Sequence, residues 1–68
     1  MEDWQNRVVK EKADLDDKIT KLGIFVTGKG YQALNSADRA LLDQQYRLMK
    51  EYSNVLGNRI SRFGKKDL

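Results

Sequence analysis

The fold is decided by a stretch in the second half of the chain, residues 41–56, which reads LLDQQYRLMKEYSNVL. Apolar residues recur every seventh position and extend beyond this stretch, through Leu42, Met49, Leu56 and Phe63. This repeat is typical of one face of an α-helix. Ser36 is a favourable helix cap and Asp38 suits the first turn, so we predict a helix over about residues 37–63.

A second apolar stripe lies upstream and predicts another helix, over about residues 3–26. Its two neighbouring rows are Val8, Leu15 and Leu22, and Trp4, Ile19 and Val26. The glycine-containing segment that follows breaks this helix, which leaves a connector over residues 27–36 with a short helical turn or a loop. The sequence therefore predicts an all-α fold, an antiparallel two-helix hairpin in one domain of residues 1–64, followed by a flexible basic tail at residues 65–68.

The second helix carries more apolar surface than one partner helix can cover. A further row, Leu41, Leu48 and Val55, lies about 100° around the helix from the Leu42 row. Closed homo-oligomers are the usual way to bury such a surplus, so we predict a homo-oligomeric helical bundle with this row at its interface. The alternative is a monomer in which the connector folds over the row. Gly57 is easier to understand if another backbone approaches it, and the alternative is an exposed glycine that the helix tolerates.

Composition excludes several classes of chemistry. The 68 residues contain no cysteine and no histidine, which argues against disulfides, a zinc site and a thiol nucleophile. No pair of carboxylates has the setting of a catalytic pair, because the acidic residues of the first helix look like a solvated face. We therefore predict no enzyme, no cofactor and no metal.

Charge and hydropathy bear on location and partners. No apolar run approaches the roughly 20 residues that a membrane-spanning helix needs, and the acidic start does not resemble a signal peptide. We expect a cytoplasmic protein without membrane association. The formal charge of +3 lies entirely in the second half, since residues 1–34 carry six cations and six anions, against seven and four in residues 35–68. This charge suits an anionic partner, whereas duplex nucleic acid would require more cations along one face.

A polar strip runs between the two apolar rows of the second helix and is the main candidate site. It consists of Gln45, Tyr52 and Arg59. Arginine can clamp a phosphate, tyrosine can stack on a base and glutamine can read a polar edge, so the strip suits a flat anionic ligand. Lys12 is its expected companion from the first helix, and Lys29, between two glycines, is a weaker candidate. The alternative is that the strip sets the register of an oligomer seam.

Both halves of the chain resemble a family of small, largely uncharacterised helical proteins of tailed phages and prophages. The first half carries this resemblance in residues 7–22, RVVKEKADLDDKITKL, followed by Phe25. The second half carries it in paired leucines at 41 and 42, and in Gln45, Met49, Tyr52-Ser53, Val55-Leu56, Arg59-Ile60 and Phe63. The resemblance implies a phage origin and a small accessory protein acting in the bacterial host cytoplasm.

Some small helical phage proteins of comparable build are oligomeric sponges for nucleotide signals of bacterial immunity. By analogy with them, we expect a counter-defence protein that sequesters a cyclic oligonucleotide or an ADP-ribose-type signal without catalysis. The alternative is a small phage protein that inhibits a host or defence protein by binding it through the broad helix face.

Overall fold

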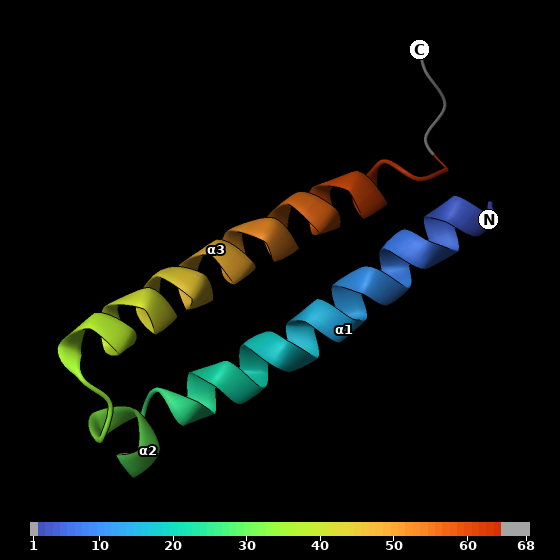
Figure 1. Ribbon diagram of the computed structural model, residues 1–68. Coiled ribbons are helices and arrows are strands. Elements are labelled where there is room, and N and C mark those ends of the chain that lie inside the picture. Colours follow the sequence, from blue (N-terminus) through green and yellow to red (C-terminus); the bar gives the residue numbers. More distant parts are fainter. Residues whose placement is uncertain (1, 65–68) are drawn as a thin grey trace.

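The computed structural model describes residues 2–64, which form three helices (Figure 1). α1 spans Asp3–Phe25, α2 spans Lys29–Gln32 and α3 spans Ser36–Ser61. No strand occurs among these residues, so the all-α prediction is confirmed. The basic tail expected at residues 65–68 lies outside the described part of the chain.

The N-cap residue of α3 differs from the predicted one. The side chain of Asn35 accepts a hydrogen bond from the backbone N–H of Asp38 at 2.8 Å, and Ser36 is already the first helical residue. Asparagine is among the strongest N-cap residues because its side-chain oxygen satisfies a free amide of the first turn. The expected cap at Ser36 was therefore wrong by one position, and the helix ends at Ser61, two residues earlier than predicted.

The two long helices lie side by side and run in opposite directions (Figure 1). The rings of Trp4 and Phe63 meet edge to face with centroids 5.1 Å apart, which brings the start of α1 to the end of α3. The molecule measures 52 × 18 × 15 Å, and its radius of gyration is 15.7 Å. A globular chain of this length would have a radius of gyration of about 11 Å. The protein is thus a rod two helices wide.

The connector packs against the end of the rod that it closes. The phenol of Tyr31 in α2 donates a hydrogen bond to the Asp43 carboxylate of α3 at 2.7 Å. Gly30 lies under the ring of Phe25, since a Cβ at this position would stand 3.0 Å from a ring carbon. The missing side chain at Gly30 lets the short helix α2 approach α1 closely.

The core between α1 and α3 is small. Of residues 2–64, only Val8, Ser53 and Leu56 are buried, and Leu56 alone is fully enclosed. The other apolar side chains along this contact are half-buried, among them Leu15, Leu42 and Met49. Such a core is marginal for a chain of this size, because small domains bury a small fraction of their surface.

None of the helices in residues 2–64 has an apolar stretch long enough to cross a bilayer.

Candidate ligand-binding site

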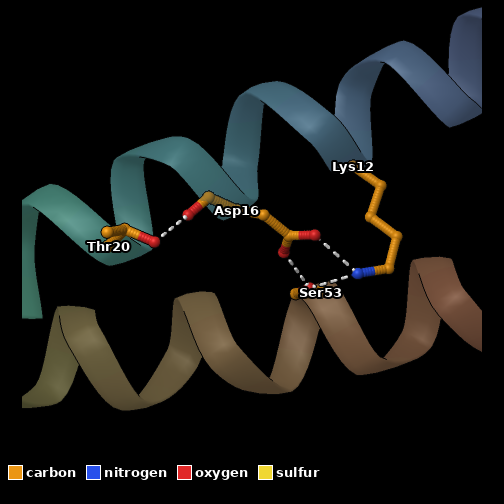
Figure 2. A network of polar contacts seen from close by, with 4 residues as sticks. All are labelled: Lys12, Asp16, Thr20 and Ser53. Atoms are coloured by element: carbon orange, nitrogen blue, oxygen red, sulfur yellow. Dashed lines mark hydrogen bonds and ion pairs between the residues drawn. The ribbon is translucent and has the colours of Figure 1, made fainter.

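A polar network crosses the contact between α1 and α3 near its middle (Figure 2). The Lys12 ammonium donates to the Asp16 carboxylate at 2.7 Å and to the Ser53 hydroxyl at 3.0 Å. The Ser53 hydroxyl donates in turn to the same carboxylate. Ser53 is only 7% exposed, so its hydroxyl needs these partners, and the network supplies them.

Electrostatics within the network favour the charged form of its acid. The hydrogen bonds from Lys12 and then from Ser53 lower the pKa of Asp16 below its ordinary value of 3.8. The Asp16 backbone carbonyl also accepts a hydrogen bond from the Thr20 hydroxyl at 3.0 Å (Figure 2). The result is a hydrogen-bonded ion pair at the contact between the two helices.

The network holds Lys12, the residue of α1 that was predicted to accompany the polar strip. Its ammonium is held by Asp16 and Ser53 in the contact between the helices, and its stem lies over Gly57 of α3. A Cβ at Gly57 would stand 3.2 Å from Lys12 Cε. A role of Lys12 beside the polar strip stays a prediction, and the close neighbour of Gly57 is this side chain rather than a backbone.

Tyr52 is the member of the polar strip that reaches toward α1. Its phenol donates a hydrogen bond to the Glu11 carboxylate, and this bond raises the pKa of Tyr52 above 10.0. The positive charge of Arg59 acts on the same phenol in the opposite direction. Tyr52 is 45% exposed, so one part of the ring remains open to a ligand.

A groove of about 410 Å³ runs along α1 beside this tyrosine. Its lining residues are Arg7, Lys10, Glu11, Asp14, Leu15, Lys18 and Tyr52. The Lys10 ammonium pairs with the Asp14 carboxylate at 3.0 Å. With three cations and two acids, the groove has a small positive excess beside an aromatic ring.

The sequence did not predict the cations of this groove. From α1 it indicated only Lys12 as a ligand-binding residue. Arg7, Glu11, Asp14 and Lys18 follow one another at spacings of three or four residues, which places them on one face of a helix. The sequence indicated a solvated face only for the acidic residues of this helix, Asp14 among them. Only the packing of α1 against Tyr52 distinguishes the face with Arg7 and Lys18 from the other charged surface of the helix.

The remaining residues of the predicted site lie elsewhere. The Gln45 amide contacts the Met49 sulfur at 3.8 Å, and both side chains line a second groove on α3. Lys29 is an exposed residue of α2, at the connector end of the rod (Figure 1). The structure thus keeps Tyr52 close to Arg59 and, in the second groove, to Gln45, whereas Lys29 lies apart from them on α2.

The second groove is apolar and has a volume of about 540 Å³. Its lining residues are Leu41, Gln44, Gln45, Leu48, Met49 and Tyr52. The row expected at an oligomer interface is open in the single chain, with Leu41 63%, Leu48 49% and Val55 53% exposed. The connector does not cover it. Tyr52 belongs to both grooves and marks the boundary between them.

Within residues 2–64, no cluster of three or more acidic side chains has the geometry to hold a metal ion.

Comparison with known proteins identifies one family. The model of the Sequestin family matches residues 2–62. No curated protein and no solved structure matches the chain. The family match extends over nearly the whole chain, including both long helices and the connector. It therefore does not depend on which residues form the binding site. The chain belongs to the Sequestin family.

Proposed function

We propose that this protein is a phage counter-defence protein that binds and retains a nucleotide immune signal in the host cytoplasm. The signal is a cyclic oligonucleotide or an ADP-ribose-type molecule, and it is held without being converted. The name of the Sequestin family supports sequestration of a small signal molecule as the general activity.

The observation that carries the proposal is the position of Tyr52, a half-exposed aromatic ring beside a cation-lined groove. A nucleotide presents a flat base and an anionic phosphate, and these need an aromatic face and a cation respectively. Tyr52 supplies the face, while Arg7, Lys18 and Arg59 supply positive charge around it. Lys10 shares its charge with Asp14, so it contributes less.

Self-association belongs to the proposal. We propose that the antiparallel pair of long helices is the subunit of a homo-oligomer. Support comes from the small core of the single chain and from the open apolar row on α3. Burial of this row between subunits would add the apolar contact that the subunit lacks. Light scattering at micromolar concentration should give a mass above the 7.9 kDa of one chain.

The test of ligand binding is calorimetric titration with a panel of cyclic oligonucleotides and ADP-ribose derivatives. We expect at least one of them to bind. Arg7→Ala or Arg59→Ala should weaken its binding about ten- to a hundredfold, because each removes a charge-assisted contact to phosphate. Tyr52→Ala should weaken it as well, and Tyr52→Phe much less, since the ring is retained.

A matched control is Lys21→Ala. Lys21 lies on the same helix as Arg7 and pairs with Asp17 at 2.9 Å, outside the groove. Its removal changes the net charge equally and should leave affinity unchanged. Equal losses for Lys21→Ala and Arg7→Ala would contradict a specific site. Ligand released by heat should be recovered intact, and a cleaved product would contradict sequestration without catalysis.

The open apolar row also favours a second candidate, in which the same face of α3 binds and inhibits a host or defence protein. Under this alternative the free protein is monomeric and none of the nucleotides binds. Pull-down of a host protein that is lost with Leu48→Asp would support it.

A further inference from the structure

The outer face of α3 carries an evenly spaced row of apolar residues. No other part of residues 2–64 packs over this row. Leu41, Leu48 and Val55 stand at equal spacings of seven residues, and all three are between 49% and 63% exposed. Leu48 is the midpoint of this row. A row with a central residue can match a second copy of itself when the copy is turned by half a turn about that residue.

The charges beside the row discriminate between two directions of pairing. Glu51 and Arg59 lie on the same side of α3 as the row, because they stand about 60° and about 20° from Leu48 around the helix. In a parallel pair the residues near the centre of the interface meet their own copies, so Arg59, about 20° from Leu48 around the helix, would lie beside the partner's Arg59. Such like-charge contacts are unfavourable.

The antiparallel direction removes these repulsions. Residues equally far before and after Leu48 then lie opposite each other, so Arg59 faces the partner's Ala37, one residue away from the partner's Asp38. Glu51 lies beside the partner's Gln44, a neutral amide on the same edge of the pair. Leu48 packs on the partner's Leu48, and Leu41 packs on the partner's Val55. The antiparallel order therefore matches apolar with apolar and separates like charges.

We propose that two copies of this chain pair through the outer faces of α3, antiparallel, with a twofold axis beside Leu48. The proposal rests on the proposed function only in requiring self-association. It also deepens that function, because Tyr52 lies at the boundary between this face and the groove on α1. The partner's Gln45 lies beside Tyr52 on the same edge of such a pair, so the second copy adds a polar side chain next to this ring.

Single cysteines introduced into the full chain test the arrangement directly, since the natural sequence has none. Leu48→Cys should form a disulfide with its own copy under mild oxidation, giving a species of twice 7.9 kDa. Leu41→Cys alone should not, because two copies of it lie 14 residues apart along the pair, or about 21 Å, against the less than about 7 Å that a disulfide needs. A mixture of Leu41→Cys and Val55→Cys chains, one carrying a mass tag, should give the mixed dimer.

Asn54→Cys is the matched control for random collision, because Asn54 is exposed on α3 but points away from the row. The proposal is supported if Leu48→Cys and the mixed pair are linked several times more than Asn54→Cys. It is overturned if Leu41→Cys is linked to itself as readily as Leu48→Cys, which is the signature of parallel pairing.

Two further measurements separate this proposal from the proposed function. Light scattering that gives an oligomer, together with no excess linking of Leu48→Cys, overturns the antiparallel arrangement and leaves self-association standing. A monomeric mass at every concentration overturns both. Nucleotide titration of the unmodified protein tests sequestration by itself, whichever residues are linked.

Discussion

The two faces of α3 carry the same kinds of apolar residue but differ in how far these residues are buried. Leu56 on the inner face is completely buried against α1, while Leu48, eight residues earlier, is 49% exposed on the outer face. Both leucines have the same hydrophobicity and helix propensity. The difference comes from the position of α1, which covers one side of α3. Apolar periodicity thus identifies faces that need partners, and the tertiary structure decides which partner each face obtains.

The faces also differ in where they place polar groups. The inner face holds Ser53 in a closed network with Lys12 and Asp16, all of whose charged ends are partnered. The outer face carries Gln45 and Arg59 at the surface beside the exposed row. Polar groups in the inner contact limit the ways in which α1 and α3 can align, since a shift along the helices would break the network.

The largest contrast is expected from truncating one leucine on each face. Leu56→Ala should lower the free energy of unfolding by about 2–5 kcal/mol, because it leaves a cavity in a very small core. Leu48→Ala should leave the fold of the subunit within about 0.5 kcal/mol of the wild type, since its side chain is half exposed there. Urea denaturation followed by circular dichroism, below the concentration at which chains associate, measures both. Equal losses of stability in the two variants would contradict the assignment of Leu56 to the inner face and Leu48 to the outer face.

A smaller effect is expected from the buried serine. Ser53→Ala removes the hydroxyl that links Lys12 to Asp16, and it should lower the free energy of unfolding by about 1 kcal/mol. The neighbouring Asn54 is exposed, so Asn54→Ala should have little effect and serves as the control. Thermal unfolding of the two variants compares them. A larger loss of stability for Asn54→Ala than for Ser53→Ala would show that the polar network does not stabilise the contact between α1 and α3.

Acid should weaken the inner contact through Asp16. Because its folded pKa lies below 3.8, its contribution to stability is fully present above that value and is lost as the pH falls through the folded pKa. Melting curves from about pH 5 to about pH 2 should therefore show a steeper loss of stability in the wild type than in Asp16→Asn.

A second variant tests the cause of that acid sensitivity. Lys12→Met removes the hydrogen bond that contributes most to the lowered pKa of Asp16. The acid-dependent loss of stability should then shrink toward that of Asp16→Asn. An unchanged pH profile in Lys12→Met would assign the effect to another carboxylate.

The smallest effect is expected at Gly57, where α3 passes under the Lys12 stem. Gly57→Ala gains helix propensity of about 1 kcal/mol, opposed by a contact of 3.2 Å with a flexible side chain that can move aside. We expect a slight gain in melting temperature. Gly23→Ala is the contrasting variant, because its Cβ would stand 2.9 Å from the Tyr46 hydroxyl, and it should lower the melting temperature.

The candidate site was predictable in part. Tyr52 and Arg59 share a row at seven-residue spacing, so their proximity follows from helix geometry alone, and the influence of Arg59 on the Tyr52 phenol agrees with it. Lys12 interrupts the apolar stripe of α1, a pattern that fits a ligand contact and an interhelix ion pair equally well. Its contact with Ser53 joins residues 41 positions apart. No local pattern encodes such a distance.

The sequence by itself determined that the chain forms two long helices, since apolar period, helix propensity and capping residues act within a few neighbouring positions. It also determined that α3 has more than one apolar face. Only the tertiary structure decided that the Leu56 row meets α1, that Lys12 turns inward, and that Arg7 and Lys18 lie beside Tyr52. These outcomes depend on the rotation and register of one helix against the other, which are set by contacts between residues far apart in the chain.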